Sequence, residues 1–400
     1  MANGVSRIGT LQVIFKIAEK CNLNCPYCYY YSGADRATDN RPPLIKKDVA
    51  NRIAQFLRRA ADDIQIDHIQ IIFHGGEPTL VKAELFDYIC SLMTERLSSK
   101  VPLSFGVQTN GVFLPEAWIR MLIKHNVSTG VSLDGPEEYN DKFRPDHNGE
   151  GSYKRIAANV HRLNSAVADS GLRPIGLVSV VNHEFDYSYV YKHFSEDLGI
   201  SKMNFLLPDK NCDADANFLD VVEKYGDKLC ELFDIWLVSG QGKVEIRQFE
   251  SLLKFFNVNV KYFSAPEGYI NNQIVVIHSD GGVGVDDSLM PATQWFQQRE
   301  TVDVDAVSLK DWLSRPDLKE VREARSTLPE DCQECRWKNL CHGGDVENRF
   351  SSKNGFSNKS IYCAALLKFY SHVEGVLLEG GYPPKAFDDV LKRVPEKVSV

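Results

Sequence analysis

The sequence lacks the features by which chains enter membranes or bind nucleic acids. No apolar run in its 400 residues approaches the length of a transmembrane helix, and the N-terminus has no signal-peptide core. There is no cluster of Lys and Arg, and the net charge is −8. We therefore expect no membrane and no nucleic-acid partner, and a chain kept in the reducing cytoplasm. The composition is otherwise that of a globular protein with a large core or two domains.

Cysteine is present ten times, which in a reducing compartment favours metal ligands or free thiols over disulfides. Cys21, Cys25 and Cys28 have the spacing C-x3-C-x2-C and follow the strand-like run Leu11–Ile17. Three thiolates can hold three irons of a 4Fe–4S cube and leave the fourth iron open to another molecule. Zinc is the alternative, but it usually takes four ligands, and no fourth partner lies nearby in the sequence.

A second cysteine set has the spacing C-x2-C-x5-C, with a fourth cysteine further along the chain. Its members are Cys332, Cys335, Cys341 and Cys363. Four thiolates can saturate a second 4Fe–4S cluster, and a zinc knuckle is the alternative. The other cysteines fall on apolar helix faces or in a polar loop, where free thiols are ordinary.

The first half of the chain alternates strand-like runs with helix-period segments, which predicts a parallel sheet with helices outside it. The predicted strands are Leu11–Ile17, Ile69–Phe73, Leu103–Thr109, Val127–Ser132, Pro174–Val181 and Lys202–Leu207. The predicted helices are Asp48–Ala60, Ala83–Leu97, Pro115–Lys124, Tyr153–Leu163 and Phe185–Phe194, with Ser152 as the N-cap of the fourth.

Polar motifs follow these strands. Gly75, Gly76 and Glu77 come after the second strand, where glycines allow close backbone approach to a ligand and Glu77 can accept a hydrogen bond from an ammonium group. Gln108 ends the third strand and can line a pocket. Arg144 has the planar fork that suits a carboxylate. The alternative for the Gly-Gly-Glu segment is a tight turn.

The cysteine spacing and these motifs resemble the radical S-adenosylmethionine (SAM) superfamily. That resemblance implies a partial (β/α)6 TIM-like barrel with its site at the C-terminal ends of the strands. It also implies that the open iron chelates SAM and that reduction yields a 5′-deoxyadenosyl radical. By the resemblance, Gly75 to Glu77 bind the SAM amino group, and Ser132 and Arg144 lie by its ribose and carboxylate. Tyr27 resembles the aromatic near adenine, or it is a packing residue.

The second cysteine set resembles the SPASM domain, an iron–sulfur extension of peptide-modifying radical enzymes. A full domain of that kind carries two auxiliary clusters. Here Asp286 and Asp345 stand where two ligands of the other cluster are expected. The resemblance therefore implies two 4Fe–4S clusters in total, with SAM as the further cofactor. We expect the barrel over 1–245, the SPASM-like domain over 246–375 and a C-terminal tail over 376–400.

The resemblance also implies the function, which is maturation of a ribosomally made precursor peptide with electrons from a donor such as flavodoxin or ferredoxin. A saturated auxiliary cluster suits electron transfer, and Asp287 is the expected catalytic base. The stretch from Cys341 to Arg349 is similar to cyclophane synthases, which join an aromatic ring carbon to a Cβ. The alternatives are formylglycine formation as in sulfatase maturases, a thioether crosslink, or a non-enzymatic zinc or iron–sulfur interaction protein.

Overall fold

The computed structural model describes residues 5–32, 40–240, 242–257 and 268–393. Its strands form one sheet in the order β10-β9-β8-β1-β2-β3-β4-β5-β6-β7. The strands are β1 Arg7–Ala18, β2 Gln65–Gly75, β3 Leu103–Thr109, β4 Ser128–Ser132, β5 Gly176–Val180, β6 Lys202–Leu206, β7 Glu245–Ile246, β8 Tyr269–Ile277, β9 Gly282–Gly284 and β10 Val302–Asp303. Strands β1 to β7 are parallel to one another, as the alternation of strand and helix predicts.

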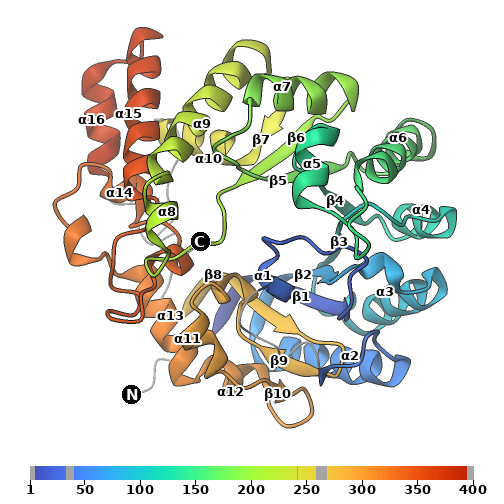
Figure 1. Ribbon diagram of the computed structural model, residues 1–400. Helices are drawn as coiled ribbons and strands as arrows, with labels where there is room; N and C mark the ends of the chain where they lie inside the picture. Colours follow the sequence, from blue (N-terminus) through green and yellow to red (C-terminus); the bar gives the residue numbers. More distant parts are fainter. Residues whose placement is uncertain (1–4, 33–39, 241, 258–267, 394–400) are drawn as a thin grey trace.

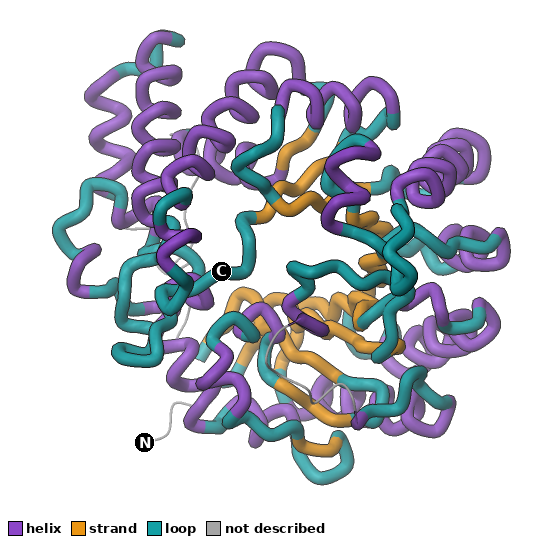
Figure 2. Tube along the Cα trace, viewed as in Figure 1, coloured by secondary structure: helices purple, strands orange, loops and turns teal. Residues whose placement is uncertain are grey.

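Helices connect these strands, and the long ones lie on the outer side of the curved sheet, whereas the short α1 lies inside it (Figures 1 and 2). In the first half they are α1 Tyr29–Ser32, α2 Lys47–Asp63, α3 Ala83–Leu97, α4 Glu116–Lys124, α5 Glu137–Phe143, α6 Tyr153–Ser170, α7 Tyr187–Lys192, α8 Ala216–Leu219, α9 Val222–Ile235 and α10 Arg247–Phe256. The six predicted strands and five predicted helices are all present, with ends that differ by a few residues. The partial-barrel α/β fold is confirmed.

The outer face of the sheet is apolar because alternate strand residues face the helices. Phe15 lies beside Phe73 in the register of β1 and β2, and both are fully buried. The Phe73 ring lies 4.8 Å from the Phe86 ring of α3, which in turn stacks on Trp118 of α4 at 4.2 Å. This chain of aromatic contacts fixes α3 and α4, the helices of the second and third crossovers, against the barrel wall.

The inner face is polar. Lys16 lies beside His74 in the register, and Gln12 lies beside Gln70. A cavity of about 470 Å³ lies against this face toward the N-terminal ends of the strands, and its lining includes Ser128, Gly176 and Lys202, the first residues of β4, β5 and β6. Lys16 and His74 lie near the C-terminal ends of β1 and β2, which is the end of a barrel where ligands bind.

The second half of the chain extends the same sheet. Strand β8 pairs in parallel with β1 on the side away from β2, although it lies beyond the predicted boundary at 245. The helices of this half are α11 Thr293–Gln297, α12 Leu309–Leu313, α13 Pro316–Ser326, α14 Lys338–Cys341, α15 Cys363–Glu379 and α16 Pro384–Lys392. Helix α15 runs through position 376, and α16 buries Phe387 and Val390, so much of the predicted tail is packed structure. Positions 394–400 lie outside the described residues.

The prediction that Ser152 is the N-cap residue of the fourth crossover helix is confirmed. Ser152 stands at the N-cap of α6, but its side chain makes no capping bond. Its hydroxyl instead donates to the carbonyl of Arg144. The carboxylate of Asp141 accepts the N–H groups of Ser152 and Tyr153 and satisfies this helix end.

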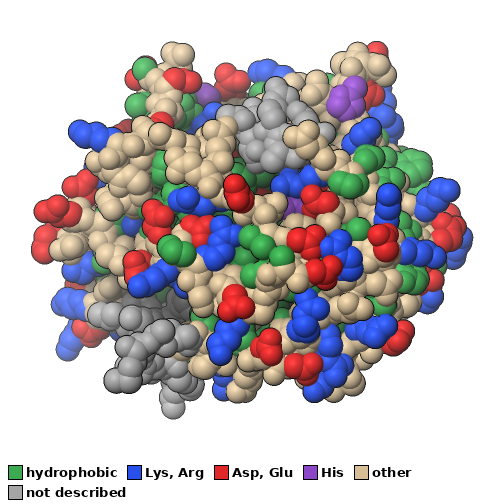
Figure 3. Space-filling view, turned by 90° about the horizontal axis from the view of Figure 1, so that it is seen from below, with side chains coloured by type: hydrophobic (Ala, Val, Ile, Leu, Met, Phe, Trp, Pro, Cys, Tyr) green, Lys and Arg blue, Asp and Glu red, His purple; other side chains and the backbone are tan. Residues whose placement is uncertain are grey.

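The described surface shows no concentration of one charge sign on the face seen in Figure 3, where Lys and Arg are interspersed with Asp and Glu. None of the described helices is both long and apolar enough to cross a bilayer.

Candidate active site

The first cysteine set lies in the loop that leaves the C-terminal end of β1. The Cys21 sulfur accepts hydrogen bonds from the Leu23 N–H at 3.4 Å and from the Asn110 amide at 3.5 Å. The loop is held from the far side by the Asn24 N–H, which donates to the Pro145 carbonyl. Burial raises the pKa of Cys21 to about 12 and also raises that of Cys25. A thiolate at Cys21 therefore needs a positive partner, which iron would supply.

The Gly-Gly-Glu segment approaches this cysteine loop closely. Gly75 has a φ of +128°, and a Cβ on it would lie 2.0 Å from the Ala18 carbonyl oxygen. A Cβ on Gly76 would lie 2.1 Å from the Lys20 carbonyl oxygen. The two glycines are therefore required by the protein's own backbone, whereas the sequence suggested that a ligand required them.

Glu77 is fully buried at the junction of β2 and β3. One carboxylate oxygen accepts from the Thr79 N–H and from the hydroxyls of Thr79 and Thr109. The other accepts only the Asn110 N–H at 2.7 Å. No ion pair of Glu77 occurs among the described residues, and burial raises the pKa of this carboxyl. A buried carboxylate with spare acceptor capacity fits the SAM ammonium group.

Arg144 lies on the other side of the cysteine loop and is 6% exposed. Its guanidinium donates to the Tyr27 hydroxyl at 2.8 Å, and that hydroxyl donates to Asp134 at 2.5 Å. The Arg144 Nε is buried without a hydrogen-bond partner. An unsatisfied guanidinium N–H near Cys25 fits the carboxylate of SAM, so the residues present suit that cofactor. Because its hydroxyl is engaged, Tyr27 also has a structural role.

Gln108 and Ser132 lie side by side on the inner face of β3 and β4. The Gln108 amide donates to the Ser132 hydroxyl at 2.9 Å. A Cβ on Gly130 would lie 2.3 Å from the Gln108 side-chain oxygen, so this glycine makes room for the pair. The structure thus gathers the predicted SAM contacts around the C-terminal ends of β1 to β4. Their contacts to SAM remain predictions.

Asp287 lies across the mouth of the barrel, immediately after β9, and is ion-paired with the buried Lys16 of β1. The Tyr29 hydroxyl also donates to its carboxylate, at 3.2 Å. Burial raises the pKa of Asp287, but the charges of Lys16 and His74 and these hydrogen bonds outweigh burial and hold it below the ordinary value. Asp287 is therefore an ionised, well-anchored carboxylate and a weak base.

The sequence did not single out Asp209, which follows β6 on the same side of the barrel. Its side chain is exposed and makes no hydrogen bond or ion pair within the described part of the chain. Partial removal from water and the nearby Asp287 charge raise the pKa of Asp209 to about 6. It also influences Tyr29 and Tyr362 electrostatically. An unpaired carboxylate with this pKa suits a proton acceptor, and only its place after a strand could have indicated it.

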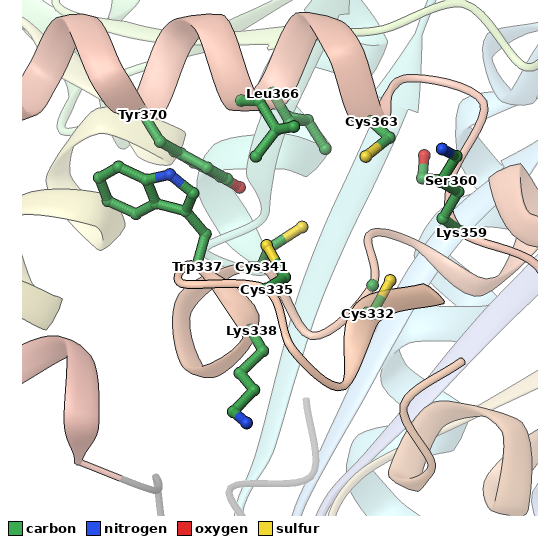
Figure 4. Close-up of a pocket in the computed structure, with 12 residues that line it drawn as sticks. Cys332, Cys335, Trp337, Lys338, Cys341, Lys359, Ser360, Cys363, Leu366 and Tyr370 are labelled. Atoms are coloured by element: carbon green, nitrogen blue, oxygen red, sulfur yellow. The ribbon is translucent and has the colours of Figure 1, made fainter. Parts of the chain in front are cut away.

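The second cysteine set surrounds one small pocket between α14 and the start of α15 (Figure 4). Its four sulfurs come from Cys332, Cys335, Cys341 and Cys363, and Trp337, Leu366 and Tyr370 wall the pocket. The Cys335 N–H donates to the Cys332 carbonyl, which forms the first tight turn. Burial raises the pKa of Cys341 to about 11, and the neighbouring thiols add to it. In the described ranges, no three His, Cys, Asp or Glu side chains are arranged to hold a single metal ion.

A second auxiliary cluster was not expected in this chain, and the region around Asp286 and Asp345, two of its missing ligand positions, contains carboxylates and an arginine. Asp286 forms an ion pair with Arg325 at 2.8 Å. Asp345 and Glu347 lie near the same arginine, and burial raises the pKa of both, that of Glu347 to about 8. This region is therefore built from polar side chains in place of sulfur ligands.

Residues 15–186 match the sequence profile described as the radical SAM superfamily. This part of the chain is similar to that superfamily, and the protein is an enzyme whose cofactors are SAM and 4Fe–4S clusters.

Individual relatives extend the similarity over most of the chain. The cysteine-type anaerobic sulfatase-maturating enzyme of Clostridium perfringens is 24% identical over 369 residues, which cover 90% of this chain and 96% of the relative. The serine-type enzyme of Bacteroides thetaiotaomicron is 21% identical and covers 88% and 86%. The solved structure "Native anSMEcpe with bound AdoMet" superposes with a TM-score of 0.76 at 22% identity and covers 92% of this chain and 98% of that one. The fold is shared over nearly the full length.

Proposed function

We propose that this enzyme matures a ribosomally made peptide by a net two-electron oxidation that joins an aromatic ring carbon to a Cβ. The observation that carries the proposal is the single four-cysteine pocket, with Asp286, Arg325 and Asp345 in the region of the other auxiliary cluster. One saturated cluster can take up one electron and leaves no iron for binding the substrate.

Different residues of the first site would hold different parts of the cofactors. Cys21, Cys25 and Cys28 would hold the cluster, while Glu77 and Arg144 would take the ammonium and carboxylate of SAM. When bound, the cluster and SAM supply a primary carbon radical that abstracts a hydrogen atom. Lys16 keeps Asp287 ionised beside Tyr29, and Asp209 stands unpaired nearby. The proton released on rearomatisation of the ring passes to Asp287, as the sequence suggested, or to Asp209.

Formylglycine formation is the second candidate, because the sulfatase-maturating enzymes match 90% of this chain. The names of those relatives say that they mature sulfatases. The carboxylates and arginine in the region of the other auxiliary cluster argue against this candidate. Both functions fit a cytoplasmic enzyme that receives electrons from a flavodoxin or ferredoxin.

The two candidates are separated by the product they make. The reconstituted enzyme is incubated with SAM, a reductant and two sets of synthetic peptides. One set carries the cysteine or serine of a sulfatase, and the other carries an aromatic residue with neighbouring side chains of varied type. A crosslink removes two hydrogen atoms, one of them from the ring, and the product does not react with hydrazine. An aldehyde product that captures hydrazine would replace the proposed function by formylglycine formation.

A further inference from the structure

Arg349 is a buried cation beside the second cysteine set. It is 2% exposed and lies at the end of the short helix η7 Val346–Arg349. Among the described residues it forms no ion pair with any carboxylate. Removing an ion from water costs free energy unless an opposite charge compensates, so a buried arginine requires a counter-ion.

The hydrogen bonds of Arg349 go only to backbone carbonyls. Nε donates to Phe356 and Asn358, Nη1 donates to Ala324 at 2.9 Å, and Nη2 donates to Thr327 and Phe356. These bonds fix the plane of the guanidinium without neutralising it. They also hold together α13, the loop after it and the segment that leads to Cys363.

The negative charges nearest to Arg349 would be thiolates. The Cys332 and Cys341 sulfurs, which belong to the four-cysteine pocket, lie close enough to act on it electrostatically. Cys212 also lies nearby, but its thiol donates to the carbonyls of Asn348 and Arg349 and carries no charge. A Cβ on Gly343 would lie 3.7 Å from Arg349 Nη1, so the Cys-His-Gly-Gly turn passes directly over the guanidinium. His342, Gly343 and Gly344 all have positive φ angles, which bend the chain tightly at this place.

A 4Fe–4S core held by four thiolates is anionic and gains a further negative charge when it is reduced. A buried positive charge beside it stabilises the reduced form more than the oxidised form, which raises the reduction potential. The other cations near the pocket are less effective. Lys338 is half-buried, but its side chain runs away from the four sulfurs in Figure 4 and its ammonium group donates to the Gln333 carbonyl. Lys359 is exposed, and Arg336 is paired with Glu374 and Asp388.

We propose that Arg349 is the counter-ion of the auxiliary cluster and raises its reduction potential enough for the cluster to accept the substrate's electron. The proposal rests on the proposed function, in which Cys332, Cys335, Cys341 and Cys363 hold that cluster. In the step concerned, the substrate radical loses one electron to the oxidised cluster and one proton to a carboxylate. Arg349 touches neither substrate nor SAM and acts through the cluster.

The test measures the potential of the auxiliary cluster alone. In a full-length C21A/C25A/C28A background, the cluster is titrated with reductant and followed by electron paramagnetic resonance. Arg349→Gln should shift the one-electron equilibrium at least tenfold toward the oxidised form, about 59 mV lower in potential. Arg349→Lys retains the charge but not the planar fork, and it should stay near the starting value. Arg336→Gln, which removes an exposed and paired charge next to Cys335, should change the potential little.

Other results would support or overturn the role of Arg349 as the counter-ion. An unchanged potential in Arg349→Gln overturns the inference, as does an equal shift in Arg349→Lys. If Arg349→Gln cannot assemble a cluster but Arg349→Lys can, the charge is needed for assembly and the inference is supported. Loss of the cluster in both variants would mean that Arg349 serves only to tie the carbonyls together. If the background variant itself holds no 4Fe–4S cluster, the proposed function fails and the inference fails with it.

Discussion

At the scale of single residues, the site consists of buried charges whose partners are either protein groups or the cofactor. Asp287 is matched by Lys16, whereas Glu77 and the Nε of Arg144 have capacity left over. We therefore expect Glu77 and Arg144 to contact SAM, because a folded protein seldom leaves buried polar groups unsatisfied.

Replacing Glu77 by Gln should weaken SAM binding about ten- to a hundredfold, because a hydrogen bond between two charged groups contributes roughly 1.5–3 kcal/mol. The side chain keeps its shape, so both clusters should be retained, but the amide nitrogen of Gln would face a backbone N–H, that of Asn110 or of Thr79, so the melting temperature should fall. Isothermal titration of the reconstituted enzyme with SAM measures the effect. Glu95→Gln, at an exposed position of α3, is the matched control. Equal SAM affinities in the two variants would make the Gly75 to Glu77 segment a turn and nothing more.

The two candidate proton acceptors differ in the pH at which they lose function. As the pH falls through about 6, Asp209 takes up a proton and can no longer accept one, so peptide oxidation should decline while SAM cleavage continues. Asp287 stays ionised there, because its pKa is held below the ordinary value. If Asp209 is the acceptor, Asp209→Asn should lower the ratio of oxidised peptide to 5′-deoxyadenosine by ~10²–10⁴-fold and abolish the acid limb.

Asp287→Asn provides the comparison for that experiment. It removes the partner of Lys16 and also the charge that helps to raise the pKa of Asp209, so it should impair oxidation and move the acid limb to lower pH without abolishing it. If the limb is lost in Asp287→Asn and kept in Asp209→Asn, then Asp287 is the base, as the sequence suggested. Asp286→Asn controls for a loss of local structure, because Asp286 is engaged with Arg325.

At the scale of elements, the local sequence pattern predicted the strands and helices that local interactions determine. Six strands and their helices were readable because apolar periodicity and strand length are local properties. The contribution of β8 to the barrel sheet was not, because its pairing with β1 joins segments more than 250 residues apart. Lys16 likewise reads as an interruption of the run Leu11–Ile17. Its partner Asp287 lies 271 residues away, and only the fold brings the two together.

The turn between β2 and η2 Pro78–Leu80 offers a test at this scale. Gly76→Ala places a methyl group against two atoms at the two ends of the cysteine loop, the backbone carbonyl oxygen of Lys20 and the side-chain hydroxyl of Tyr31. Overpacking of this kind costs about 1–3 kcal/mol and should displace the loop. We expect the first cluster to be lost or unstable and the second to be kept, as measured by iron content and by SAM cleavage. Gly375→Ala in α15, where no atom lies within 4 Å of the added methyl group, should stabilise the protein slightly.

At the scale of the whole molecule, the continuous sheet joins a barrel that binds SAM to a C-terminal half that holds the second cysteine set. The cysteine spacing gave both sets, because cluster ligands are close in sequence except for Cys363. The spacing could not predict that Arg349 is buried without a carboxylate partner in the described part of the chain, or that Asp209 lies near Asp287. Both depend on how distant segments pack. Conversely, the domain limits at 245 and 375 stay predictions, because the sheet and α15 run across them.

The two clusters should assemble independently, and iron content measures this. The wild-type enzyme is expected to bind about eight irons per chain, four at each site. Changing Cys21, Cys25 and Cys28 to Ala should leave about four and abolish SAM cleavage, because the open iron is gone. Changing Cys332, Cys335 and Cys341 to Ala should also leave about four, but SAM cleavage should continue while peptide oxidation stops, since the electron has no acceptor. Twelve irons, or zinc held tightly at the second site, would contradict the assignment. Continued peptide oxidation without the second cluster would instead show that the electron returns to the first cluster or to SAM, and would remove the reason for Arg349 to raise a potential.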